Sequence, residues 1–244
     1  MKRQAQVGGH VRRTGPGGSS RAPAQHRRQS LSDSRKREIL SAALYCFTTI
    51  GFNGATLADI RVRAHASIGS IYHHFRSKEQ LAAALYVEGL RDYQDNFLAE
   101  LHRHQRAREA VRGLVHNHLR WVEDNPDWSR FLYEYRQSEF VTTVEEEIKG
   151  LNDSFYRAGA SRWQDFFQTG EMVEVPRDLL MAILLGPSQE FARHWLAGRA
   201  NTDLEDAAEV LAESAWRALG VTPLNPRARR TRHRRGRNDS AEGL

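Results

Sequence analysis

The chain has 244 residues, of which 40% are hydrophobic, and a formal net charge of +6. This length suits one or two domains that each bury an apolar core. The single cysteine, Cys46, excludes an intramolecular disulfide. The sequence contains no run of about 18 apolar residues, so we expect no membrane-spanning helix. We therefore expect a cytoplasmic protein without membrane contact.

The charge is unevenly distributed along the chain. Residues 1–33 carry seven Lys or Arg against one Asp, and residues 221–244 carry seven Arg against two acidic residues. Both segments are poor in apolar residues, so we expect a disordered basic tail over 1–33 and a disordered Arg-rich tail over 221–244. Residues 34–79 have seven basic against three acidic residues, whereas the remainder of the chain is acidic. Such asymmetry is typical of a protein that presents one end to a polyanion.

The first predicted helix covers about residues 34–50, where apolar residues recur at helical spacing and Gly51 follows as a stop. Its apolar stripe consists of Ile39, Leu40, Ala43, Leu44 and Phe47. A stripe of this width needs further helices to pack against, and these follow directly in the sequence.

The segment Ala55–Leu81 predicts two short helices joined by a tight turn, and the start of a third helix. Thr56 is a capping residue with Asp59 three positions later, where its carboxylate can reach back to the cap. Ser67 and Ser77 are placed to cap the second short helix and the third helix. A short helix that a turn holds against another helix is the arrangement that enters a DNA major groove.

At these residues the chain resembles a known family. The segment RKREILSAALYCFTTIGFNGATLADIRVRAHASIGSIYHHFRSKEQL is similar to the N-terminal DNA-binding domain of TetR-family (tetracycline-repressor-like) transcription regulators, over residues 35 to about 85. One departure lies in the turn, where Ala64, His65, Ala66 and Ser67 replace the family's usual Ala-Gly-Val-Ser. Gly adopts a left-handed backbone conformation without steric cost, so we expect His65 to form the turn under slight strain, near the surface.

The outer face of the second short helix is a candidate for DNA contact. Gly69 and Ser70 are small enough for close approach, while Tyr72 and His73 offer a hydroxyl and an imidazole. The helix start at Ser77 and Lys78 offers N–H groups and a cation for a phosphate. The alternative is that IYHHF is only a core aromatic run. The predicted DNA-binding residues are Thr56, Ser67, Gly69, Ser70, Tyr72, His73 and Lys78.

Six further helices are predicted after the second short helix, and no strand pattern or repeat stands out. They cover about residues 77–103, 107–124, 128–135, 144–167, 176–197 and 203–219, the last capped by Thr202. We therefore expect an all-α protein of nine helices. Residues 34–80 form its helix-turn-helix DNA-binding domain, and residues 81–220 form a larger helical domain for effector binding and dimerisation.

The resemblance implies a small inducer in the larger domain and dimerisation through the last two helices. The candidate ligand-binding side chains are Trp121, Trp128, Phe131, Tyr135, Phe155, Trp163 and Phe167. The alternative is that these aromatic residues are plain helical core. Specific DNA binding also favours a dimer, because one short helix makes too few contacts with DNA for specificity. A two-fold dimer presents two such helices to a near-palindromic operator.

Nothing in the sequence predicts catalysis, a cofactor or a metal ion. Nucleotide-binding and hydrolase motifs are absent, and none of the eleven histidines has the i, i+4 spacing that lets two imidazoles share an ion. We expect a homodimeric repressor that a small apolar effector releases from double-stranded DNA. Alternatives are an activator, an effector-independent regulator or, from another class, a helical enzyme or lipid-carrier domain with incidental basic tails.

Overall fold

The computed structural model describes residues 22–221, which form ten helices and, apart from one isolated bridge between Met172 and Gly220, no β-structure. The helices are α1 (Ala22–Thr49), α2 (Leu57–Arg63), α3 (Ile68–His74), α4 (Lys78–Arg103), α5 (Ala107–Asp124), α6 (Pro126–Glu134), α7 (Glu139–Thr142), α8 (Glu145–Gln168), α9 (Arg177–Leu196) and α10 (Leu204–Leu219). The predicted all-α class is confirmed over this part of the chain.

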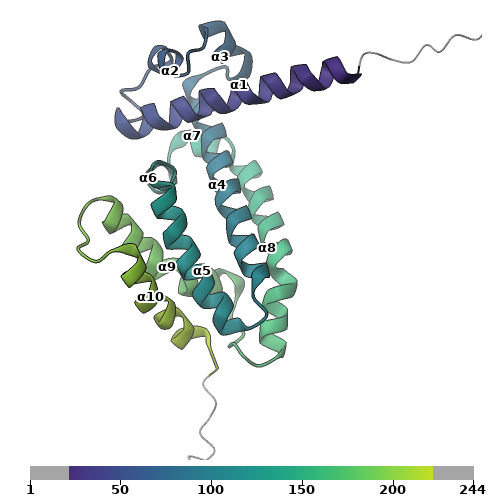
Figure 1. The fold of residues 1–244 in the computed structure, drawn as a ribbon, viewed down its shortest axis with the longest axis vertical. Coiled ribbons are helices and arrows are strands. Elements are labelled where there is room, and N and C mark those ends of the chain that lie inside the picture. The colour runs from purple at the N-terminus through teal and green to yellow at the C-terminus, as the bar shows by residue number, and fades with distance from the viewer. Residues whose placement is uncertain (1–21, 222–244) are drawn as a thin grey trace, which may run out of the picture.

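The ten helices form an elongated molecule with α1, α2 and α3 at one end (Figure 1). Helix α4 leads away from this end and runs beside α8, and α5 returns toward it. Helices α9 and α10 pack on each other and on α5. The short helices α6 and α7 bring the chain back beneath α1.

One helix boundary, one additional helix and one capping residue differ from the prediction. Helix α1 begins at Ala22, so the expectation of disorder over 1–33 is wrong from residue 22 onward. Pro23 suits a first helical turn, and the polar residues after it include good helix formers and no further Gly or Pro. The four-residue helix α7 was not expected, and Asp203 rather than Thr202 caps α10. The rest of the two predicted tails, 1–21 and 222–244, lies outside the described residues.

The core consists of three clusters of buried side chains, and the first crosses the expected domain boundary at residue 80. It combines side chains of α1–α4 with Phe131 on α6 and with Phe140 and Val141 on α7. The second cluster lies among α4, α5, α8, α9 and α10, and the third lies among α5, α9 and α10. The helix-turn-helix end therefore shares one core with α6 and α7.

Five aromatic rings form the centre of this shared core, and we call them the junction aromatic cluster: Phe47, Phe52, Phe131, Tyr135 and Phe140. Phe52 lies 4.8 Å from Phe140 between ring centroids, and Phe47 stacks on Phe131 at 6.0 Å. The backbone N–H of Phe52 also donates to the hydroxyl of Tyr135 at 3.1 Å. These contacts join the turn after α1 to helices that follow about 80 residues later in the chain.

Helices α4 and α6 approach closely at a glycine. Gly89 on α4 is buried, and a Cβ built there would overlap the ring of Trp128, with Cζ3 at only 2.6 Å. Gly150 on α8 is also helical, but a Cβ there would meet no atom within 4 Å. Close packing therefore requires a glycine at position 89, whereas position 150 has room for a larger side chain.

We expect Gly89→Ala to destabilise the protein by about 1–3 kcal/mol, because the added methyl overpacks the α4–α6 contact. Gly150→Ala is the matched control and should be neutral or stabilising by up to about 1 kcal/mol, because Ala favours the helix over Gly. Urea unfolding followed by circular dichroism measures both midpoints. Equal midpoints for the two variants would contradict close packing of Trp128 on α4.

Candidate nucleic-acid interface

Local capping sets the geometry of the helix-turn-helix. Thr56 Oγ1 accepts from the N–H of Asp59 at 3.2 Å, and Asp59 Oδ2 accepts from the N–H of Thr56 at 2.8 Å. The side-chain hydrogen bond from Thr56 is the main cause that lowers the pKa of Asp59. Ser67 and Ser77 accept from the N–H groups three residues on, at 3.0 and 3.1 Å. All three caps predicted for this segment are confirmed.

The turn between α2 and α3 contains a left-handed residue, as the sequence predicted. His65 has φ +47°, and it is the one residue other than glycine with positive φ in the described part of the chain. The N–H of Ala66 donates to the carbonyl of Arg61 at 3.1 Å and closes the turn. The imidazole of His65 is exposed, so the turn keeps its shape with a histidine where Gly is usual in the family.

Helix α3 has one face in the core and one in solvent. Ile71 and Phe75 are buried, whereas Tyr72 is 52% exposed and His73 is also exposed. Of the remaining predicted contacts, Thr56, Ser67 and Gly69 are exposed and Ser70 is half-buried. The structure thus brings these candidate residues to one end of the molecule, although their contact with DNA stays a prediction.

Lys78 does not fit its predicted role as a free cation for phosphate. Its ammonium donates to the carbonyls of Phe52 and Ala55 at 2.7 and 3.0 Å and lies 4.5 Å from the centroid of the Phe52 ring. The side chain therefore ties the start of α4 to the turn before α2. Because these carbonyls belong to residues 23 and 26 positions earlier, the sequence alone carried no sign of the contact.

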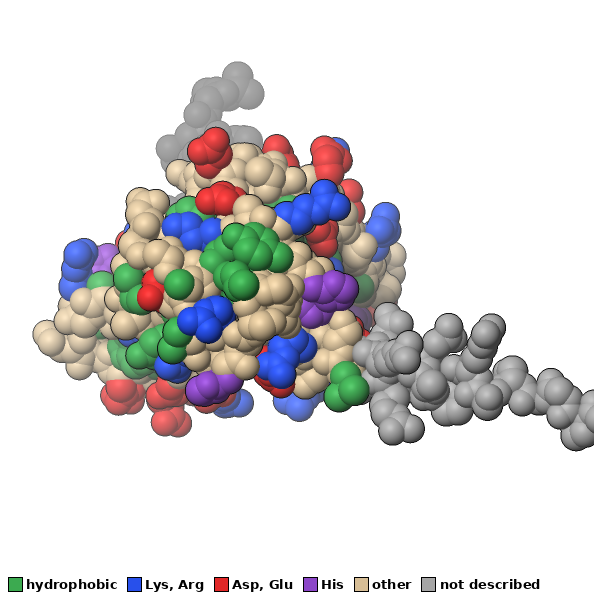
Figure 2. Space-filling view, turned by 90° about the horizontal axis from the view of Figure 1, so that it is seen from above, with side chains coloured by type: hydrophobic (Ala, Val, Ile, Leu, Met, Phe, Trp, Pro, Cys, Tyr) green, Lys and Arg blue, Asp and Glu red, His purple; other side chains and the backbone are tan. Residues whose placement is uncertain are grey.

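Helix α1 adds basic side chains that the list of predicted residues omitted. Lys36 is exposed and acts electrostatically on His74, whose pKa is lowered first by burial and then by His73 and Lys36. Figure 2, which looks at this end from above, shows Lys, Arg and His side chains across its middle and most acidic side chains toward its edges. The run Arg35-Lys36-Arg37 before the apolar stripe was the sequence signal for this contribution.

The seven aromatic residues predicted to bind a ligand are not brought together. Phe131 and Tyr135 belong to the junction aromatic cluster, and Trp128 packs beside them. Trp121 lies in the third core cluster, where its indole N–H donates to Asp92 at 3.0 Å. The other three, Phe155, Trp163 and Phe167, lie in or against the second core cluster. Their packing fits the core alternative better than a single cavity.

The larger domain contains a buried polar centre that the sequence analysis missed. His118 is 3% exposed, and its Nδ1 and Nε2 lie 2.9 and 3.4 Å from the hydroxyls of Tyr93 and Tyr133. Burial lowers the pKa of His118 to about 4, so its imidazole is neutral at pH 7. The ring nitrogens thus offer one donor and one acceptor to the two tyrosines. Residue spacing gave no hint, because the partners come from α4 and α6.

Two other properties of the described residues bear on function. No three His, Cys, Asp or Glu side chains among them come together as metal ligands would. None of their helices combines the length and apolar character that a bilayer span requires.

The sequence matches the family model for bacterial regulatory proteins of the tetR family over residues 39–85. It is 26% identical over 197 residues to the HTH-type transcriptional activator FasR of Mycolicibacterium smegmatis, which covers 79% of this chain and 86% of that protein. It is 37% identical over 94 residues to the HTH-type transcriptional repressor AcnR of Corynebacterium jeikeium, which covers 38% of this chain and 44% of that protein.

Solved structures have the same fold. A TetR family transcription regulator from Marinobacter aquaeolei VT8 superposes with a TM-score of 0.65 at 21% identity, covering 80% of this chain and 100% of that one. The transcriptional regulator FadR from Bacillus subtilis, solved in complex with stearoyl-CoA, gives a TM-score of 0.63 at 18% identity over 73% of this chain and 96% of that one. At these identities the likeness concerns the fold.

If the outer face of α3 reads DNA, Tyr72→Ala and His73→Ala should each weaken specific binding by roughly 1–3 kcal/mol. Both side chains are exposed, so the melting temperature should change little. Fluorescence anisotropy on a duplex obtained by random-sequence selection measures the affinity. His102→Ala, an exposed histidine in the last turn of α4, is the matched control. If both α3 variants bind DNA with wild-type affinity, the prediction that α3 contacts the major groove is wrong.

Proposed function

Because this chain is a member of the TetR family of transcription regulators, and hence a DNA-binding regulator and not an enzyme, we propose that it is a homodimeric repressor that a small effector releases from its operator. The observation that supports this most directly is the outward face of α3, with Tyr72 and His73 exposed beside basic side chains. In this proposal residues 34–80 bind DNA in the cytoplasm, and residues 81–220 dimerise and bind the effector.

Dimerisation through α9 and α10 is supported by large apolar side chains that these helices leave uncovered in the single chain. Leu179 on α9 is 49% exposed and Val210 on α10 is 68% exposed. An exposed leucine or valine alone needs no explanation, but the last two helices are also those the family uses for pairing. A two-fold dimer presents two α3 helices to a near-palindromic operator.

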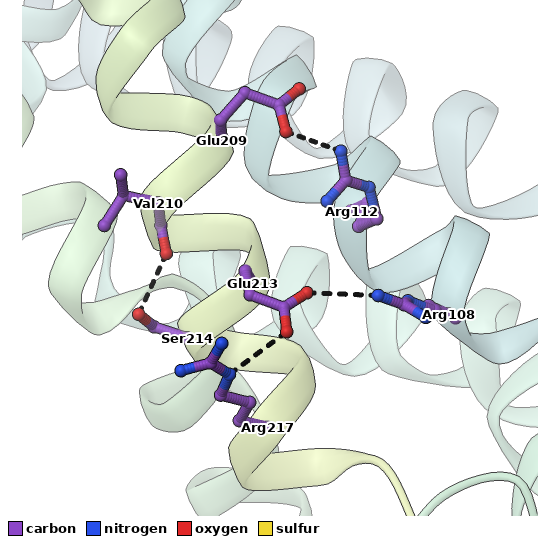
Figure 3. A network of polar contacts seen from close by, with 7 residues as sticks. All are labelled: Arg108, Arg112, Glu209, Val210, Glu213, Ser214 and Arg217. Carbon is purple, nitrogen blue, oxygen red and sulfur yellow. Dashed lines mark hydrogen bonds and ion pairs between the residues drawn. The ribbon is translucent and has the colours of Figure 1, made fainter.

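Ion pairs with α5 fix the rotation of α10 so that Val210 faces outward (Figure 3). Glu209 pairs with Arg112 at 2.6 Å, and Glu213 pairs with Arg108 at 3.2 Å. Figure 3 shows both glutamates directed toward α5, with Val210 and Ser214 on another side of α10. Each exposed pair is worth little alone, but a row of them specifies one orientation of the helix.

Val210→Glu should convert the dimer to a monomer, because two carboxylates would face each other across the two-fold axis. Light scattering after size exclusion measures the mass. Operator affinity should fall at least about tenfold when the two half-sites are no longer joined. Gln164→Glu, which adds the same charge to an exposed position on α8, should leave both unchanged. A Val210→Glu dimer with normal operator affinity would place the interface elsewhere.

The third core cluster supports effector binding in the larger domain. Tyr93 and Tyr133, the two partners of His118, pack against this cluster, as do Phe191 and Trp195. A neutral imidazole between two tyrosine hydroxyls is a hydrogen-bonding centre in apolar surroundings, and ligand sites combine the same two features. We therefore propose that an amphipathic effector binds beside His118 and the third core cluster, and not in a cavity formed by all seven aromatic residues predicted from the sequence.

Stearoyl-CoA, present in the structure of the Bacillus subtilis FadR, is a suitable first probe, and stearate and free coenzyme A test its two parts separately. Quenching of tryptophan fluorescence measures its affinity with and without operator. Release of DNA requires a coupling of about 1–3 kcal/mol, and by linkage operator must weaken effector binding by the same factor. Equal effector affinity in both states would exclude release by this ligand.

An activator is the second candidate, because FasR, which is similar over most of its length, is one. The two modes differ in transcription and not in DNA binding. In-vitro transcription from the selected operator decides between them: a repressor lowers transcript and an activator raises it.

A further inference from the structure

A cleft of about 650 Å³ opens beside the junction aromatic cluster. One wall is the turn after α1 together with the first turn of α4, and the other is the end of α6 with α7. Its lining residues are Ile50, Gly51, Phe52, Asn53, Gly54, Glu79, Glu134, Tyr135, Ser138, Glu139, Phe140 and Thr143. The lining residues include neither His118 nor its partners Tyr93 and Tyr133, although Tyr133 directly precedes Glu134 in the chain.

Aromatic rings form the apolar part of the cleft. Phe52, Tyr135 and Phe140 all line it, with ring centroids 4.8–6.3 Å apart. The protein itself places a cation on one of these rings, because the ammonium of Lys78 lies 4.5 Å from the centroid of Phe52. Aromatic faces attract cations through their quadrupole, so these rings suit a ligand that is both flat and positively charged.

Carboxylates supply the polar part. Glu79, Glu134 and Glu139 line the cleft and are exposed, and no basic side chain is among the lining residues. Within the described part of the chain, none of the three has a basic partner within ion-pair distance. The ammonium of Lys78 is the cation beside this wall, and it already donates to the carbonyls of Phe52 and Ala55. Its charge also acts on Glu79, so one cation faces three carboxylates and the cleft keeps a net negative charge.

We propose that this cleft binds an amphipathic organic cation, with an aromatic or alkyl body against Phe52, Tyr135 and Phe140 and an amidinium or ammonium group among Glu79, Glu134 and Glu139. The volume is within the range of drug-sized ligand sites, about 300–1,000 Å³. Charge complementarity selects a cation over a neutral or anionic ligand of the same shape. The site is separate from the proposed operator and effector sites, and its test needs neither.

The test uses pentamidine, which carries two benzamidinium groups on a five-carbon linker, and its uncharged bis-amide analogue. Isothermal titration of the full chain, without DNA, measures both affinities. The cation should bind at least about tenfold more tightly than the neutral analogue. Glu134→Gln with Glu139→Gln should weaken the cation about five- to tenfold and leave the analogue unchanged, because these carboxylates attract only the charged ligand.

The control removes the same charge from Glu123 and Glu174, two exposed glutamates outside the cleft. Glu123→Gln with Glu174→Gln should change the affinity by less than about twofold, since solvent and salt screen distant charges. Unchanged melting temperatures without ligand verify that both double variants fold. The proposal is overturned if pentamidine does not bind at about 1 mM, if the bis-amide binds equally well, or if both double variants weaken binding to the same extent.

Discussion

The arrangement of this protein depends on the packing of Phe47 and Phe52 against Phe131, Tyr135 and Phe140. These rings come from the helix-turn-helix end and from α6–α7, and together they form one continuous core. Truncating a fully buried ring such as Phe131 to Ala typically costs about 3–5 kcal/mol, which is a large part of a domain's stability. The DNA-binding end is therefore attached to the larger domain by the contacts with α6 and α7 as well as by the continuous helix α4.

This packing changes how a signal would travel between the two functional ends. The long helix α4, Lys78–Arg103, leads from the helix-turn-helix end into the larger domain. The structure adds α6 and α7, which contact α1 and α4 through apolar rings and through the bond from Phe52 N–H to the Tyr135 hydroxyl. Close-packed cores are not continuously deformable, so a shift of α6 would move the α1–α2 turn as a unit.

The sequence predicted what depends on neighbours in the chain. Thr56, Ser67 and Ser77 cap helices through groups three residues away, so composition and spacing were enough to identify them. The left-handed backbone of His65 was predicted from a single turn position, at which the resembling family usually has Gly. The internal use of Lys78 and the environment of His118 depend on residues 15 to 26 positions away, which no local pattern reveals. The packing of the seven aromatic residues fits the alternative that they are helical core, but their helical spacing could not specify which of three clusters each one joins.

The distribution of charge has a consequence for orientation on DNA. Basic side chains lie across the end formed by α1–α3. The cleft, which is lined in part by the turn after α1, carries three carboxylates without an ion-pair partner. A duplex close to both would be attracted by the first and repelled by the second, and within a Debye length of about 8 Å at physiological salt neither effect is screened out. The acidic wall therefore favours the approach in which α3 faces the groove and the α6–α7 side faces away. It gives orientation without supplying affinity. The contacts of Phe52 with Tyr135 and Lys78 hold the α1–α2 turn in place between these two charged regions.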